Sequence, residues 1–222
     1  LFDASAAEPR IEFTDYVLSA DERRLLLTTD VEPIYRHSFT AEYWIYDRQD
    51  GSLRRLSQGG PQQQAQFSPD GSRVAFVRGG NLFVADPAAG SERQLTFDGR
   101  FNHINGLPDW VYEEEFSFAR AFAWSPDGRK IAYLRFDESR VKQYNMNRFA
   151  GGLYPENYTF KYPKAGEQNS VVELYCCDAA DGSTVRMDTG EQTDQYIPRL
   201  FWTPTGQLGF YRLNRLQNHF EV

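Results

Sequence analysis

Cysteine and histidine are both scarce in this sequence. The 222 residues include two cysteines, Cys176 and Cys177, which are adjacent. Neighbouring side chains of a strand point to opposite faces, so a disulfide between them would be strained. We therefore predict plain buried or half-buried thiols. The three histidines, His37, His103 and His219, are scattered and have no metal-ligand spacing. We expect no metal site, and nothing indicates a cofactor.

The sequence also lacks long apolar runs and an excess of basic residues. No run approaches the roughly 20 apolar residues that a membrane span requires. The chain begins with Leu1 and shows no signal peptide, so we expect a fragment whose targeting segment lies outside it. The net charge is −7 and no basic stripe is present, which argues against nucleic acid, DNA included, as a partner. The net negative charge is compatible with cationic ligands, or it serves only to keep the protein soluble.

Aromatic residues are abundant and the sequence repeats itself. Aromatics make up 15% of the chain, which favours strands because these side chains suit a pleated, half-buried surface. Residues 66–77 read QFSPDGSRVAFV and residues 123–134 read AWSPDGRKIAYL, with degenerate copies beginning at residues 18 and 202. In each corner Pro fixes φ, Asp bonds neighbouring backbone and Gly accepts positive φ. Each unit is therefore an apolar strand end, a tight turn and a second strand.

Further strand signals follow each corner, so each unit holds about four strands. Such a repeat predicts an all-β fold of antiparallel four-stranded blades, a partial β-propeller of about four blades over residues 1–222. The alternative is a β-sandwich with common turns, although sandwiches do not repeat the same corner after an aromatic residue. No stretch longer than a turn or two has the pattern of an amphipathic helix.

Two segments, at about 98–120 and 137–170, interrupt the repeat. Long excursions from a regular scaffold are usually functional or interfacial. The first contains DWVYEEEF at residues 109–116. Three consecutive carboxylates between aromatic residues repel one another, and one would take up a proton unless a cation is supplied. A solvated acidic turn is the alternative, and the local residues alone do not decide between the two.

A family resemblance bears on this choice. DWVYEEE at residues 109–115 resembles the acidic motif of the dipeptidyl peptidase IV family of prolyl oligopeptidase-like serine peptidases. YRHSFTAEY at 35–43, YPKAG at 162–166 and LNRLQN at 213–218 match the family in order, so the resemblance covers essentially the whole chain. It implies a bacterial parent and an eight-bladed propeller, of which this chain holds about half. One departure is a segment about one residue shorter after Glu115, which leaves the pocket roles of Phe116, Ser117 and Phe118 open.

The resemblance also assigns substrate-binding residues. It implies that Glu114 and Glu115 clamp the free α-ammonium of a peptide, and that Arg36 reaches the carbonyl of the residue before the scissile one. A regular strand would send adjacent glutamates to opposite faces. We therefore expect a short helix or bend facing the inner mouth of the propeller, with Arg36 nearby to offset the repulsion between the carboxylates.

The chain carries no catalytic residue that we can identify. It has no Gly-x-Ser-x-Gly elbow and no alternation of strands and helices. We expect the α/β-hydrolase domain with the triad to lie outside it, and the fragment to be inactive alone. The resemblance implies a periplasmic or secreted serine dipeptidyl peptidase that removes N-terminal dipeptides with penultimate Pro or Ala. It also implies a homodimer formed through an arm at 137–170. The alternatives are a non-catalytic protein-interaction propeller and an unrelated scaffold propeller.

Overall fold

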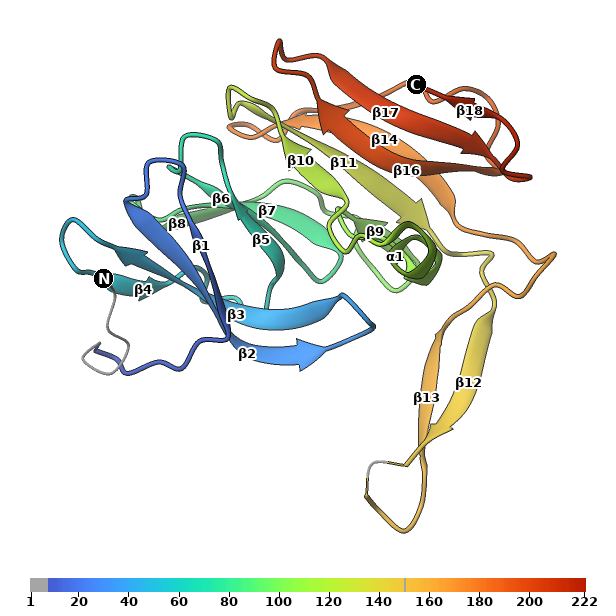
Figure 1. The fold of residues 1–222 in the computed structure, drawn as a ribbon, viewed down its shortest axis with the longest axis horizontal. Coiled ribbons are helices and arrows are strands. Elements are labelled where there is room, and N and C mark those ends of the chain that lie inside the picture. The colour runs from blue at the N-terminus through green and yellow to red at the C-terminus, as the bar shows by residue number, and fades with distance from the viewer. Residues whose placement is uncertain (1–7, 150) are drawn as a thin grey trace.

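A computed structural model describes residues 8–149 and 151–222, and it is built from antiparallel sheets set side by side around an arc (Figure 1). Blades 1 and 2 each have four strands in sequence order. The strands of blade 1 are β1 (Asp15–Leu18), β2 (Arg24–Pro33), β3 (Phe39–Asp47) and β4 (Leu53–Arg55); those of blade 2 are β5 (Gln63–Phe67), β6 (Val74–Arg78), β7 (Asn81–Asp86) and β8 (Ser91–Gln94).

Blades 3 and 4 depart from the regular pattern. In blade 3 a short extra strand pairs with the far end of the second strand, and blade 4 has three strands within the chain. The strands of blade 3 are β10 (Phe122–Trp124), β11 (Lys130–Asp137), β14 (Val171–Asp178) and β15 (Thr184–Arg186), with β9 (His103–Asn105) on β11; those of blade 4 are β16 (Gln195–Trp202), β17 (Leu208–Asn214) and β18 (Phe220–Glu221). The predicted all-β partial propeller is confirmed, and the sandwich alternative was wrong.

The repeated corner occupies the same place in every blade, between the first and second strands. Ser68 is buried, and its Oγ donates to Asp70 at 2.6 Å and accepts the Arg73 amide at 3.0 Å. Ser125 makes the matching bonds in blade 3. Gly71 closes the turn with φ +70°, a conformation that residues with a Cβ adopt only with strain. The equivalence of the corners that the sequence predicted is confirmed.

Adjacent blades are joined through these corners. The Arg24 guanidinium of blade 1 donates to the Gly71 carbonyl of blade 2 at 2.8 Å. The Arg73 guanidinium of blade 2 donates in the same way to the Gly128 carbonyl of blade 3 at 2.6 Å. Between blades, buried apolar side chains form continuous clusters that each draw on two neighbouring sheets. The core therefore lies between the blades, as expected for a propeller.

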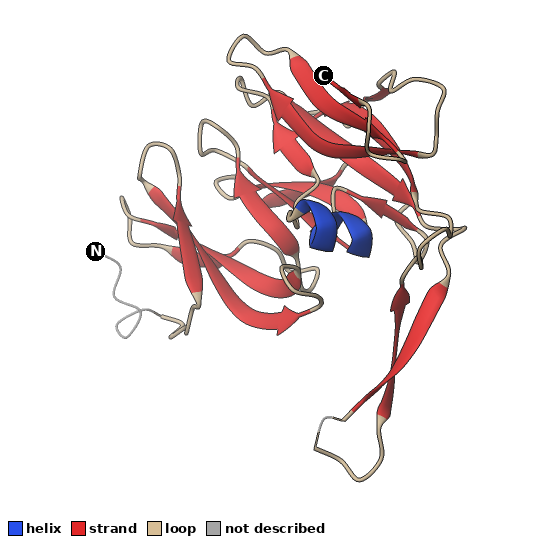
Figure 2. Cartoon of the chain, turned by 45° about the vertical axis from the view of Figure 1, so that its right-hand side comes forward, coloured by secondary structure: helices blue, strands red, loops and turns tan. Residues whose placement is uncertain are grey.

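Both excursions adjoin blade 3: the first lies between β8 of blade 2 and β10, and the second between β11 and β14. The first carries β9 and α1 (Trp110–Phe116), the one helix in the part of the chain that the structure describes. The second carries a hairpin of β12 (Gln143–Arg148) and β13 (Glu156–Lys161), which extends away from the blades in both views (Figures 1 and 2). The sequence did not predict β9. Within residues 8–149 and 151–222, no helix has the length and apolar character needed to cross a membrane.

The two thiols are free, as predicted. Cys177 is fully buried and Cys176 is half-buried, because successive residues of β14 face opposite sides of the blade. Burial raises the pKa of the Cys177 thiol to about 12, so this group stays protonated and unreactive at neutral pH.

The blade 1–blade 2 contact can be tested with a matched pair of glycines. Gly71 and Gly51 have φ of +70° and +71°, but a Cβ on Gly71 would lie 2.8 Å from the Ser19 Cβ whereas one on Gly51 meets nothing within 4 Å. Both alanine variants bear the left-handed strain of about 1–2 kcal/mol. Gly71→Ala should lower the free energy of unfolding by about 1–3 kcal/mol more than Gly51→Ala, because it overpacks the interface. Denaturant unfolding followed by tryptophan fluorescence measures both; equal losses would contradict this packing.

Candidate functional site

The acidic segment forms the short helix that we predicted. Asp109 is the N-cap: its backbone is extended, and its Oδ1 accepts the Tyr112 amide at 2.9 Å. Ser117, with φ +56°, ends the helix in a left-handed conformation. The Asp109 side chain is buried and also accepts the Ser170 hydroxyl, 61 residues later, at 2.5 Å. One carboxylate thus begins the helix and ties the first excursion to the end of the second.

Tyr112 holds the helix against the blades. It is 1% exposed, and its hydroxyl accepts the Ile197 amide of β16 at 2.9 Å. Its ring meets those of Phe136 and Phe116 edge-on, with centroids 4.8 Å and 5.1 Å away. These contacts bury the Tyr112 side of α1 against blades 3 and 4. They leave other positions of the short helix free for polar contacts.

Glu114 and Arg36 meet although 78 residues separate them. Arg36 lies in the turn between β2 and β3, and its Nε donates to Glu114 Oε2 at 2.8 Å. The Glu114 side chain is 17% exposed and that of Arg36 is 71% exposed. Glu115 is exposed, and among the described residues it has no hydrogen-bonding or ionic partner. The predicted proximity of Arg36 to the acidic segment is confirmed.

Glu113 plays a part that the sequence did not reveal. Its carboxylate is 1% exposed and accepts the backbone amides of His37 and Ser38 at 2.7 Å and 2.8 Å. The family resemblance assigns roles to Glu114 and Glu115 only, and nothing in the residue pattern distinguishes Glu113 from them. Successive helical residues point about 100° apart, so a two-turn helix packed on one side cannot expose all three equally. This helical geometry could have predicted that one glutamate is buried, but not that it would bind the amides of His37 and Ser38.

The base of the hairpin arm packs on the helix. The Trp110 ring of α1 lies 4.5 Å from the ring of Tyr162 and 6.2 Å from that of Phe160, measured between centroids. Phe160 also lies 6.1 Å from Tyr35, the neighbour of Arg36. The hairpin, the helix and the β2–β3 turn therefore meet at one aromatic junction.

This junction divides the arm into a packed and an exposed part. Tyr158, Phe160 and Tyr162 are half-buried. Further out along the hairpin and at its tip, the exposed apolar side chains of the described residues are Met146, Phe149, Leu153 and Tyr154. Tyr144 is partly exposed but lies at the base, opposite Phe160. The arm thus has a packed base and an apolar tip.

Glu138 is a second buried carboxyl, at the start of the second excursion. It is 5% exposed, and burial raises its pKa to about 7, with repulsion from Asp109 and Asp137 adding to the shift and Lys161 opposing it. Burial raises the pKa of Asp109 as well. The Lys161 ammonium donates to the backbone carbonyls of Glu138 and Val141 at 3.1 Å and 3.0 Å, which places a cation beside Glu138.

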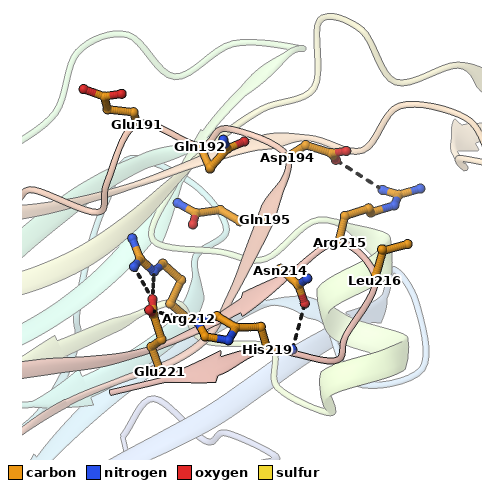
Figure 3. A pocket seen from close by; sticks show the side chains of 10 residues that line it. All are labelled: Glu191, Gln192, Asp194, Gln195, Arg212, Asn214, Arg215, Leu216, His219 and Glu221. Carbon is orange, nitrogen blue, oxygen red and sulfur yellow. Dashed lines mark hydrogen bonds and ion pairs between the residues drawn. The ribbon is translucent and has the colours of Figure 1, made fainter.

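A separate polar hollow lies on blade 4 and does not include the acidic helix. The pocket has a volume of about 510 Å³, and Figure 3 shows that most of its charged side chains are paired with one another, whereas Glu191 has no dashed line. Arg212 pairs with Glu221, and Arg215 lies 3.8 Å from Asp194. Hydrogen bonds from His219 and Arg212 lower the pKa of Glu221. None of the residues that we predicted to bind substrate lines this pocket. No group of three or more potential metal ligands is found in residues 8–149 and 151–222.

Four-stranded blades, with an acidic helix in the segment that leads into the third, define a β-propeller with an acidic insert. The chain belongs to the dipeptidyl peptidase IV family: residues 19–222 match the family model "Dipeptidyl peptidase IV (DPP IV) N-terminal region". This family match rules out the unrelated scaffold propeller that we considered as an alternative.

Individual relatives agree with the family match. The chain is 35% identical to "Prolyl endopeptidase FAP" of Mus musculus over 217 residues, which cover 94% of this chain and 28% of the relative. It is 34% identical to "Dipeptidyl peptidase 4" of Trichophyton tonsurans, covering 95% of this chain and 28% of the relative. The crystal structure of Porphyromonas gingivalis dipeptidyl peptidase 4 superposes with a TM-score of 0.89 and 42% identity, over 94% of this chain and 30% of that one. The chain therefore spans less than a third of each of these proteins.

The buried Glu138 carboxyl makes stability depend on pH. Below about pH 4.5, the Glu138 carboxyl is largely protonated in both the folded and the unfolded state. Between pH 4.5 and 7, it loses its proton in the unfolded chain but keeps it in the folded chain. The free energy of unfolding of the wild type should therefore fall, relative to Glu138→Gln, by up to about 3 kcal/mol across this window and no further above it.

Denaturant unfolding of the two proteins at a series of pH values measures this difference. The exposed Glu156→Gln provides a control, since it should follow the wild type. If the Glu138→Gln and wild-type curves run parallel from pH 4.5 to 7, the carboxyl is not protonated in the folded state.

Proposed function

We propose that this chain is the substrate-gating propeller region of a serine dipeptidyl peptidase, in which Glu114 and Glu115 bind the α-ammonium of a peptide and Arg36 its carbonyl. The observation that carries the proposal is the Arg36–Glu114 ion pair beside an exposed Glu115 that has no polar partner among residues 8–149 and 151–222. Membership of the dipeptidyl peptidase IV family supports it. The substrates are peptides with a free N-terminus and a penultimate Pro or Ala.

The chemistry of the helix suits a cationic ligand. A peptide α-amino group has a pKa of about 7.7–8.0, so it is largely charged near neutral pH. At about 4 Å and an effective dielectric of about 20, each carboxylate attracts it with roughly 4 kcal/mol before desolvation is subtracted. Glu114 and Glu115 also lie in the last turn of α1, where the partial negative charge of the helix end favours a cation.

The same clamp sets where the peptide is cut. Two extended residues span about 7 Å, so a nucleophile held at that distance from the clamp attacks only after the second residue. The nucleophile and its triad belong to an α/β-hydrolase domain of the same parent chain, since this chain has no Gly-x-Ser-x-Gly elbow. An acetylated N-terminus loses the charge–charge attraction and is a poor substrate.

The glutamates can be tested one at a time in the full-length parent. Glu114→Gln and Glu115→Gln should each lower kcat/KM for a Gly-Pro anilide at least ~100-fold, which corresponds to about 2.7 kcal/mol of transition-state binding. Thermal stability should change little, because each variant removes one of several crowded carboxylates. The exposed Glu156→Gln variant is the control and should keep wild-type kinetics.

The purely structural alternative has a different signature. If the glutamates only fix the excursion through Arg36, the variants will melt at lower temperature and will lose activity equally on free and N-acetylated substrates. Wild-type kinetics in both glutamine variants would refute the clamp. A parent reading frame without the nucleophile elbow would favour the non-catalytic interaction propeller instead.

The arm is proposed as a dimer contact of a periplasmic or secreted parent. Phe149, Leu153 and Tyr154 at its tip are 72%, 97% and 86% exposed, and a soluble monomer rarely presents so much contiguous apolar surface. A second copy of the parent is the partner that the family resemblance suggests.

Deleting residues 145–156 tests the arm in the full-length parent. The deletion removes the exposed tip and spares Phe160 and Tyr162, which pack on Trp110. Sedimentation velocity should then show a folded monomer where the wild type is a dimer. A deletion variant that stays dimeric at low micromolar concentration would count against the arm as the interface.

A further inference from the structure

We propose that Glu113 is a positioning residue: by holding the backbone at His37 and Ser38, it fixes where Arg36 presents its guanidinium to the substrate. The inference rests on the proposed function and extends it to a residue outside the clamp. Arg36 immediately precedes the two amides that Glu113 binds, at 2.7 Å and 2.8 Å.

The turn that carries Arg36 is held before it by the arm, where the Tyr158 hydroxyl donates to the Ile34 carbonyl at 3.2 Å, and after it by Glu113. The turn joins β2 to β3 and is closed by the Ile34 amide, which donates to the Ser38 carbonyl at 2.9 Å. The Arg36 side chain is 71% exposed, so packing does not restrict it. A long exposed side chain on a short turn samples many positions. Fixing the backbone directly after it narrows that range before a ligand binds.

Glu113 is suited to this task by its burial. A carboxylate that is 1% exposed is costly unless hydrogen bonds compensate for lost water, and its donors here come from the turn rather than from its own helix. The helix is held separately, by the Asp109 cap and by the Tyr112 hydroxyl on Ile197. Removing the Glu113 carboxylate should therefore release the backbone at His37 and Ser38 first and leave α1 in place.

Glu113 and Glu114 thus act on Arg36 from one helix in two ways. Glu113 holds the backbone after it and Glu114 pairs with its guanidinium. A substrate that takes up Glu114 would break the ion pair but not the backbone bonds. Arg36 would then stay within reach of the substrate carbonyl instead of moving away with its turn.

A double-mutant cycle in the full-length parent tests this role. Steady-state kinetics on a Gly-Pro anilide are measured for Glu113→Ala, Arg36→Ala and the double variant. Glu113→Ala should lower kcat/KM about 10-fold, mostly through KM, and should add less than about twofold in the Arg36→Ala background, because residues that act through one another are not additive. Glu113→Gln keeps an oxygen that can accept both amides and should stay within about threefold of the wild type.

Hydrogen exchange supplies a second readout that does not depend on turnover. The amides of His37 and Ser38 should exchange faster in Glu113→Ala than in the wild type, while the Tyr112 and Ile197 amides should not change. If Glu113→Ala does not fold, the cycle is run with Glu113→Gln. The smaller loss of kcat/KM that Glu113→Gln causes should disappear in the Arg36→Ala background.

The outcomes separate this inference from the clamp itself. Full additivity of Glu113→Ala and Arg36→Ala, or wild-type kinetics in Glu113→Ala, would overturn the positioning role while the clamp stands. Failure of the clamp shows instead as wild-type kinetics in Glu114→Gln and Glu115→Gln.

Discussion

Three consecutive carboxylates on a two-turn helix are the constraint around which this site is organised. Like charges so close together repel, and each must be stabilised by a different environment. Glu113 is buried against two backbone amides, Glu114 pairs with Arg36, and Glu115 remains in solvent. The helix can carry this charge because Asp109 caps it and Tyr112 anchors it to β16. The unsatisfied part of the charge is the part that we assign to a peptide ammonium.

The scaffold brings the helix, the arm and Arg36 together from blades 1 and 3. The first excursion leads into blade 3 and the second leaves it, so the helix and the hairpin arm adjoin the same sheet and are tied by the Asp109–Ser170 hydrogen bond. Arg36 comes from blade 1 and reaches across the arc of the propeller. The relative position of blades 1 and 3 depends on the corner contacts, in which Arg24 and Arg73 each bind the next glycine carbonyl. Blade packing thus positions the site.

Local sequence patterns were sufficient to predict the blade repeat and the kind of segment that carries the glutamates. The Ser-Pro-Asp-Gly corners act through bonds within six residues, so the hairpins and the blade repeat could be read directly from residues 68–73 and 125–130. The need for Glu114 and Glu115 to reach one ammonium group predicted a short helix or a bend, and the structure has the helix. Contacts between distant segments could not be predicted, because the pattern does not specify which buried donor a carboxylate will find. The burial of Glu113 on residues 37 and 38, the packed base of the arm and the extra strand β9 all belong to this class.

The central claim is that the unsatisfied charge of the acidic helix binds the N-terminus of a peptide. A crystal structure of the full-length parent with an uncleaved N-terminal peptide bound tests it most directly. We predict the α-ammonium within about 2.7–3.2 Å of both the Glu114 and Glu115 carboxylates, with the Arg36 guanidinium turned to the substrate carbonyl and the Glu113 bonds unchanged. A peptide bound with its ammonium elsewhere, and with the Arg36–Glu114 ion pair intact, would contradict the account.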